Sequence, residues 1–151
     1  MTPRNRTWAV PCALWSPTTT LGAKFANLNQ PARVLYLYES TCLARNWPGL
    51  YRLELDDIWD DVGLIGSVRA DAMARLEVAG LARYDHEHAL VFVVDAFDVQ
   101  AQPDGALRNA ARCVLEFAES PLAAQFVKRY PAVRAHLAAL TDDWRARVGV
   151  R

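Results

Sequence analysis

The sequence predicts an α-rich α+β fold, and three observations predict it. Apolar residues recur at helical spacing in three segments, residues 32–44, 55–62 and 68–79. A short alternating segment, 50–53, lies between the first two, and Gly80 ends the last. Two short apolar runs, 81–84 and 89–94, then flank the polar residues 85–88, as in a β-hairpin. This order of elements is that of a winged helix-turn-helix, with the hairpin as its wing.

The remaining segments frame this module. We expect one domain over residues 1–151, because 151 residues, 52% of them hydrophobic, suffice for one core of ordinary size. Residues 1–30 contain three Pro and no sustained period, so we expect an irregular N-terminal arm. Residues 31–98 form the winged helix, and residues 104–148 form additional C-terminal helices packed on it. The arm should pack through large apolar side chains, namely Trp8, Leu14, Trp15 and Phe25.

The first helix, 32–44, follows Pro31, which suits a first helical position, and "RNWPG" ends it. "LYRLEL" alternates from Leu50 and predicts a strand of about four residues. Asp56 and Asp57 lie near the start of helix 55–62, where the helix dipole favours carboxylates. Ser67 is expected to cap helix 68–79, whose core-facing residues are Val68, Ala72, Leu76 and Ala79. The expected core is Val34, Leu35, Leu53, Ile58, Leu76, Leu81, Val91 and Val93.

The net charge of zero hides an uneven distribution. Between Trp47 and Asp98 there are four positive and eleven negative residues, a net charge of −7, so the flanks together carry +7. Such asymmetry is evidence about binding partners. The three cysteines are widely spaced, which indicates free thiols in a reducing cytosol, and no apolar run is long enough to span a membrane. We therefore expect a cytoplasmic protein without a membrane partner.

Four stretches resemble the N-terminal winged-helix module of phage and prophage replication-initiation proteins, the replisome-organiser or DnaD-like proteins. They are "LNQPARVLYLYEST", "PGLYRLELDDIWDDVGL", "ARLEVAGLARYDHEHALVFVVDAF" and "SPLAAQFVKRYP", and the resemblance as a whole extends over about residues 14–131. The resemblance implies a winged helix that acts in DNA replication or its control, in the cytoplasm of a bacterial host. It implies binding to nucleic acid or to a replication protein.

The third helix of a winged helix usually enters the DNA major groove. The outward face of residues 68–79 is small, apolar and acidic, and carries no base-reading side chain. The Asp residues of helix 55–62 are either a steering field for a basic partner or a solvated face. The predicted partner-binding surface comprises Asp56, Asp57, Asp60, Asp61, Ala70, Asp71, Ala74, Glu77 and Val78. Candidate nucleic-acid contacts, or simply surface cations, are Arg33, Arg45, Arg108, Arg112, Lys128, Arg129 and Arg134.

No catalytic motif is present, so we predict a protein that is not an enzyme and holds no metal or cofactor. His86 and His88 provide two imidazoles without a third ligand, which favours a solvated wing tip over a metal site. "TTTLGAK" lacks the spacing of a phosphate-binding loop. Cys42 and Cys113 lie on apolar helix faces, as core thiols do.

Two functional hypotheses follow. The first is a non-enzymatic phage-type winged-helix protein that acts in DNA replication by binding a replication protein, or DNA through its basic flanks. The second is a phage-encoded acidic inhibitor of a host nucleic-acid machine, as a DNA mimic or an anti-CRISPR-type factor. The resemblance favours the first hypothesis, and the charge of −7 favours the second. We expect a protein partner, either a replication protein or a host nucleic-acid machine; the first hypothesis also allows DNA as the partner, and neither hypothesis fixes the oligomeric state.

Overall fold

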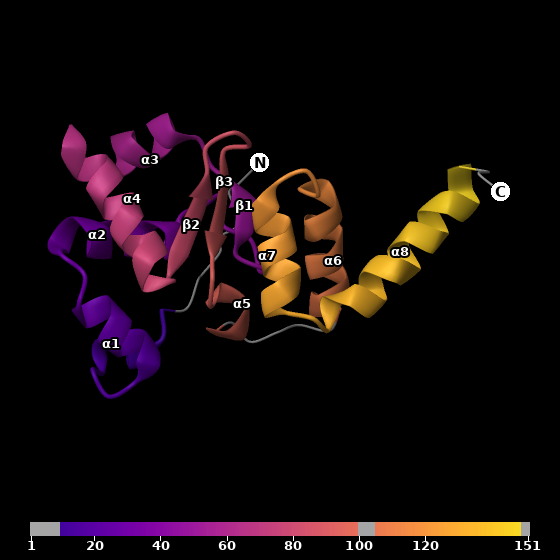
Figure 1. Cartoon of the computed structure of the whole chain (residues 1–151), viewed down its shortest axis with the longest axis horizontal. Helices are drawn as coiled ribbons and strands as arrows, with labels where there is room; N and C mark the ends of the chain where they lie inside the picture. The colour runs from indigo at the N-terminus through magenta and orange to yellow at the C-terminus, as the bar shows by residue number, and fades with distance from the viewer. Residues whose placement is uncertain (1–9, 100–104, 149–151) are drawn as a thin grey trace, which may run out of the picture.

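A three-stranded antiparallel sheet lies at the centre of the computed structural model, which describes residues 10–99 and 105–148 (Figure 1). The strand order is β1-β3-β2, and helices lie on both sides of the sheet. The elements are, in chain order, η1 (Cys12–Trp15), α1 (Thr20–Ala26), α2 (Gln30–Thr41), β1 (Leu50–Arg52), α3 (Leu55–Val62), α4 (Ser67–Ala79), β2 (Ala82–Asp85), β3 (Leu90–Val93), α5 (Ala96–Val99), α6 (Ala106–Glu116), α7 (Pro121–Arg129) and α8 (Val133–Val148). The predicted α-rich α+β class is confirmed.

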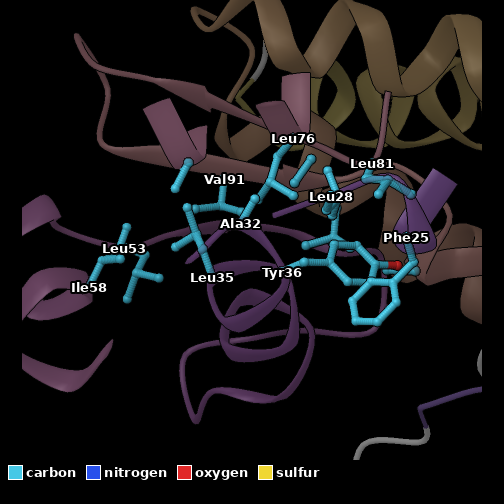
Figure 2. Close-up of a cluster of buried hydrophobic side chains, with 14 of the residues drawn as sticks. Phe25, Leu28, Ala32, Leu35, Tyr36, Leu53, Ile58, Leu76, Leu81 and Val91 are labelled. Carbon is cyan, nitrogen blue, oxygen red and sulfur yellow. The ribbon is translucent and has the colours of Figure 1, made fainter. Parts of the chain in front are cut away.

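The two faces of β3 belong to different hydrophobic cores, because successive side chains of a strand point to opposite faces. Val91 and Val93 pack in a first core with residues of α1 to α4, part of which is drawn in Figure 2. Leu90 and Phe92 pack in a second core with residues of α6 and α7. β2 and β3 form the predicted hairpin, with each strand within one residue of its predicted bounds.

α2 begins two residues earlier than predicted because Asn29 caps it. The Asn29 side chain accepts a hydrogen bond from the backbone N–H of Ala32 at 3.1 Å. The helix ends at Thr41, three residues before the predicted end. Val34 is 39% exposed, so its prediction as a core residue is wrong. It lies off the buried face, whose members repeat every three or four residues: Ala32, Leu35, Tyr36 and Glu39.

α3 has its predicted bounds, and α4 begins one residue earlier than expected. Ser67 is therefore the first helical residue, and its prediction as the N-cap is wrong. Val68 was expected in the core but is 39% exposed. The reason is that α4 is buried in its second and third turns, where Ala72 and Leu76 lie in the first core and the helix contacts α2.

Gly80 ends α4 and directs the chain into the hairpin, as predicted. Its φ of 66° lies in the left-handed region that glycine adopts without strain. The N–H of Gly80 bonds to the carbonyl of Glu77 at 2.9 Å, and the N–H of Leu81 bonds to the carbonyl of Leu76 at 3.0 Å. These two bonds form a Schellman motif, and its two leucines are both buried. The end of α4 and the start of the hairpin are thus fixed by the same apolar contact.

The N-terminal arm is more ordered than predicted, because η1 and α1 form within residues 10–30. The Thr19 hydroxyl accepts from the backbone N–H of Gly22 at 3.0 Å and caps α1. A Cβ on Gly22 would lie 1.9 Å from the carbonyl oxygen of Ser16, so only glycine fits there. Leu14 and Phe25 are buried as expected, Trp15 is 67% exposed against expectation, and Trp8 lies outside the described residues. Trp15 stays on the surface, with its ring edge-on to Phe25.

The C-terminal helices α6 and α7 contact the second face of the sheet. α7 begins at Pro121 as predicted, with the Ser120 side chain as its cap, and α8 begins two residues after Pro131. α5 follows β3 and overlaps the end of the segment 31–98. An aromatic cluster with ring centroids 4.9 to 5.9 Å apart joins strand and helices: Phe92, Phe97, Phe126 and Tyr130.

Seven of the eight predicted core residues are buried and are confirmed: Leu35, Leu53, Ile58, Leu76, Leu81, Val91 and Val93. Six of them are labelled in the first core in Figure 2, together with Phe25 and Leu28 from the segment that contains α1. The first core therefore joins the N-terminal segment to α2, α3 and α4, and this junction positions the surfaces described next.

Candidate partner-binding surface

The nine residues predicted to bind a partner are all exposed. They do not form one continuous patch, because one end is apolar and the other is acidic. The four aspartates lie on α3, whereas Ala74 and Val78 lie on the C-terminal half of α4. In Figure 1, that half of α4 runs toward α1 and away from α3. The predicted surface is therefore two separate surfaces, one on the C-terminal half of α4 and one on α3.

Ala74 and Val78 line a groove between α1 and α4 with a volume of about 470 Å³. Val78 is 90% exposed, more than any other large hydrophobic side chain among the described residues. We call this feature the α1–α4 groove; its lining residues are Lys24, Asn27, Leu28, Ala74, Arg75, Val78 and Ala79. The sequence analysis missed α1 and with it one wall of the groove. Thr19 followed by Gly22 and Phe25 was the local signal for this helix.

The charged residues around this groove are basic. The Arg75 side chain donates to the Asp71 carboxylate at 2.8 Å, and Asn29 donates to the same oxygen at 3.1 Å. The bond from Arg75 is the main reason that the pKa of Asp71 lies below its ordinary value. Lys24 enters no ion pair among the described residues. The groove thus combines an apolar lining with an unneutralised ammonium group at its edge.

The other end of the predicted surface is acidic. We call Asp56, Asp57, Asp60 and Asp61 the α3 carboxylates; all four are exposed, and none forms an ion pair among the described residues. Asp61 accepts a hydrogen bond from the Tyr38 hydroxyl at 2.6 Å. The pairs 56/60 and 57/61 are one helical turn apart, so each pair shares a face of α3. Ile65, in the turn that follows, is 75% exposed beside them in the chain.

Several of the candidate nucleic-acid contacts have structural partners. Arg45 is only 2% exposed and donates to the carbonyl of Ser40 at 2.5 Å, so its prediction as a nucleic-acid contact is wrong. The chain folds back after α2, and this places the guanidinium of Arg45 next to the C-terminal end of that helix. Arg33 donates to the carbonyls of Phe25 and Ala26, at 3.2 and 2.6 Å.

Arg129 is exposed but ion-paired, with Asp95 at 3.1 Å and with Asp98 at 2.8 Å. The remaining four candidates are exposed on the C-terminal helices and enter no ion pair among the described residues: Arg108, Arg112, Lys128 and Arg134. A surface for nucleic acid would therefore rest on these four side chains, which are spread over α6, α7 and α8.

Asp85, His88 and Ser120 meet where the hairpin approaches α7. The Asp85 carboxylate accepts from the Ser120 hydroxyl at 2.6 Å and lies 2.7 Å from Nδ1 of His88. Burial alone would raise the pKa of Asp85, but the bonds from Ser120 and His88 outweigh it and leave the pKa below its ordinary value. The carboxylate lies between the other two groups, so no imidazole contacts the hydroxyl as a general base would. This cluster joins the β2–β3 hairpin to the start of α7.

Glu39 is a buried acid that the sequence analysis did not single out. It is 2% exposed in the middle of α2, and its Oε2 has no hydrogen-bond partner. Burial raises the pKa of Glu39 to about 8. A small cavity of about 30 Å³ adjoins it, lined also by Arg83, Tyr84 and His86. At neutral pH this carboxyl group is therefore protonated.

The described residues contain no group of three metal-ligating side chains. Cys113 donates to the carbonyl of Leu50 at 2.9 Å, and burial raises the pKa of its thiol to about 12. None of the described helices is long and apolar enough to cross a bilayer.

Comparison with protein-family models, with curated proteins and with solved structures found no match. The functional proposal below therefore rests on the geometry together with the sequence pattern.

Proposed function

We propose that this chain is a non-enzymatic winged-helix protein that acts in DNA replication, or in its control, by binding a partner protein through the α1–α4 groove. Three helices followed by a hairpin whose second strand also pairs with β1 support the winged-helix assignment. The resemblance of the sequence to replisome-organiser modules supports the link to replication.

The observation that carries the protein-binding role is the exposure of Val78 beside an apolar groove. A large apolar side chain left 90% exposed loses the stabilisation of burial, on the order of 1.5–3 kcal/mol, unless a partner covers it. Ala74, next to it on α4, is small and permits close approach of a second backbone or side chain. Grooves of this kind accept an apolar anchor residue of a partner, with charged groups at the rim setting its orientation.

DNA reading by α4 is disfavoured on chemical grounds. Base edges are read by Arg, Lys, Asn or Gln side chains, and α4 offers only Arg69 and Arg75. Arg69 donates to the carbonyl of Leu64 at 2.6 Å, and Arg75 is held by Asp71. The α3 carboxylates would also face a phosphate backbone that requires cations. A protein partner meets none of these obstacles.

Replacing Val78 by Arg tests the proposal, with Leu43→Arg as the matched control. Leu43 is 81% exposed, lies outside the groove, and gains the same charge and bulk. The tagged chain and both variants serve as bait in extracts of the source cell, and the retained replication proteins are quantified. We expect Val78→Arg to lower the amount of the specific partner at least tenfold, a change of about 1.4 kcal/mol. Leu43→Arg should leave it unchanged.

A titration with duplex DNA across salt concentrations tests the opposing model, in which α4 reads DNA. If α4 reads DNA, the wild-type chain binds duplex with a steep salt dependence, and Val78→Arg or Ala74→Arg strengthens that binding. This outcome, or equal loss of the partner with Leu43→Arg, would overturn the assignment of the groove. Both variants must retain the wild-type circular dichroism spectrum, which we expect because surface substitutions usually change stability by about 0.5 kcal/mol or less.

A second candidate function is favoured by the α3 carboxylates. Four exposed aspartates within one eight-residue helix provide a concentrated negative field for a basic nucleic-acid-binding groove. The chain would then act as an acidic inhibitor of a host nucleic-acid machine. Replacing the four aspartates by Asn should abolish the interaction in that case, whereas Val78→Arg should leave it intact. The groove proposal predicts the reverse pattern.

A further inference from the structure

A cleft lined by cationic side chains lies between the hairpin and α7. Its volume is about 360 Å³, and we call it the β2–α7 cleft; its lining residues are Gly80, Arg83, Phe92, Val94, Gln125, Lys128 and Arg129. Three of the seven lining residues are cationic, and no carboxylate is among them. A cleft lined in this way concentrates positive potential over a small area and favours an anionic ligand.

Two of the three cations in this cleft are not neutralised. Lys128 is exposed and enters no ion pair among the described residues. Arg83 donates to the side-chain oxygen of Gln125 at 2.6 Å, and because this acceptor is neutral, the guanidinium is fixed in place and keeps its charge. Arg129 is already paired with two aspartates and adds little net charge. The cleft therefore presents a fixed guanidinium and an exposed ammonium group to an anion.

The β2–α7 cleft adjoins the α1–α4 groove at the end of α4. Ala79 lines the groove, and the next residue, Gly80, lines the cleft. The ammonium nitrogen of Lys24, which lines the groove, would lie 3.8 Å from a Cβ added to Gly80. In Figure 1, α1, the end of α4, the start of β2 and the end of α7 lie along the lower side of the view. Lys24 thus adds a third unneutralised cation where the two surfaces meet.

We propose that the β2–α7 cleft binds carboxylates of an acidic segment of the partner protein, whose neighbouring apolar residue occupies the α1–α4 groove. This inference rests on the proposed role of that groove and adds the chemistry of the partner. The carboxylates pair with Lys24, Arg83 and Lys128. An Arg–carboxylate pair has a preferred geometry, so the pair with Arg83 also orients the segment. The two surfaces together match a segment that carries an apolar side chain beside acidic ones.

An acidic peptide fits these surfaces better than nucleic acid does. The α1–α4 groove has an apolar lining and exposes Val78, so it can bury an aliphatic or aromatic side chain, which a phosphate backbone does not supply. Binding to duplex DNA draws its affinity from many phosphate contacts, on the order of 6–10. The cleft and its boundary with the groove hold three unneutralised cations, which suffice for two or three carboxylates.

Amide chemical shifts of the isotope-labelled full chain test the proposal with defined probes. The first probe is a peptide of about twelve residues that repeats Leu-Glu-Glu and spans about 40 Å when extended. The second repeats Leu-Gln-Gln and lacks the charges. We expect the acidic peptide, at up to about 1 mM, to shift the amides of Ala74 and Val78 in the groove together with those of Arg83 and Lys128 in the cleft. The uncharged peptide should bind at least tenfold more weakly.

Gln125→Glu tests the charge of the cleft without changing its shape. The new carboxylate keeps the bond to Arg83 and neutralises it, so the acidic peptide should bind about threefold to fivefold more weakly. Asn109→Asp, the matched amide-to-acid change on the exposed surface of α6, should leave binding unchanged. Lys128→Glu should weaken binding at least as much as Gln125→Glu does, whereas Arg108→Glu, the same reversal of charge on α6, should not.

Each failure has a distinct signature. If the acidic peptide shifts only the α1–α4 groove, or binds Gln125→Glu and Lys128→Glu as it binds the wild-type chain, the inference is wrong and the groove proposal stands. If the peptide shifts only the cleft, the groove of the proposed function is wrong and the cleft remains a carboxylate site. No shift of either surface at about 1 mM overturns the inference. The inference is also overturned if an oligothymidine of about twelve nucleotides shifts the cleft and displaces the peptide, because the cleft is then a phosphate site.

Discussion

Replacing Glu39 by Gln should remove the loss of stability that ionisation of this carboxyl group causes between pH 4.5 and about pH 8. Glu39 is buried, its Oε2 has no hydrogen-bond partner, and its pKa rises from 4.5 to about 8 on folding. Above pH 4.5 the unfolded chain loses the proton, whereas the folded chain keeps it up to about pH 8. The stability associated with this group is therefore fully present below pH 4.5 and is lost as the pH rises to about 8.

The size of the effect follows from the pKa difference. Each pKa unit corresponds to about 1.36 kcal/mol, so a shift from 4.5 to about 8 sets an upper limit near 5 kcal/mol. Water entry and local relaxation reduce such penalties, so we expect about 2–5 kcal/mol. Gln has the same shape but no charge to lose. Its amide still needs hydrogen bonds, which costs on the order of 1–3 kcal/mol at all pH values. The signature is thus the change with pH and not the absolute stability.

Urea unfolding of the wild-type chain and of Glu39→Gln at intervals from pH 4.5 to 9 measures this difference. We expect the free energy of unfolding of Glu39→Gln to rise by about 2–5 kcal/mol relative to that of the wild-type chain across that range. Glu77→Gln is the matched control, because Glu77 lines the same small cavity but is exposed. Parallel pH curves for wild type and Glu39→Gln would show that Glu39 is ionised in the folded protein, and the reasoning from burial would be refuted.

Three further substitutions test how the elements are held together. Leu76→Ala should destabilise the fold by about 2–5 kcal/mol in urea unfolding, because Leu76 is 1% exposed in the first core and belongs to the motif that ends α4 before the hairpin. Ser120→Ala should cost about 1–2 kcal/mol, since it removes the cap of α7 and the bond to Asp85; equal stability of the variant would contradict that role. Gly22→Ala should cost more than the roughly 1–3 kcal/mol of ordinary overpacking, because the new Cβ meets a backbone oxygen; a thermal midpoint equal to wild type would count against the close approach of η1 and α1.

Periodicity predicted the middle of the chain well because the helices there bury one face each, and a glycine and a polar turn bound the first strand of the hairpin. Helix 55–62 and the hairpin were confirmed within one residue. The predictions that Val34 and Val68 lie in the core were wrong for a common reason. Both residues are apolar and lie near the expected buried face of their helix, but the direction from which a neighbouring helix approaches decides which side chains are buried. That direction is a tertiary property and has no local signal.

The candidate site was harder to predict than the fold, because it depends on what lies next to α4. The exposed residues of α4 could be chosen from the helical projection, but the second wall of the groove comes from α1, which the three prolines and three threonines of the arm concealed. Arg45 shows the same limit for charge. Its position after a helix end suggested a surface cation, whereas the folded chain uses it to bond the carbonyl of Ser40.

The C-terminal helices also bear on whether the β2–β3 hairpin can act as a nucleic-acid-binding wing. A wing that contacts nucleic acid presents its strands and tip to the sugar-phosphate backbone, with cations available to neutralise it. Here Arg83 of β2 donates to the side chain of Gln125 in α7 at 2.6 Å, and Asp85 accepts from Ser120 at the start of the same helix. Arg83 of the hairpin is thus bonded to α7, and Asp85 is held by Ser120 at the start of that helix. This arrangement makes the hairpin a structural link between the two cores. The exposed apolar surface of α4 then becomes the part of the module best suited to bind a partner.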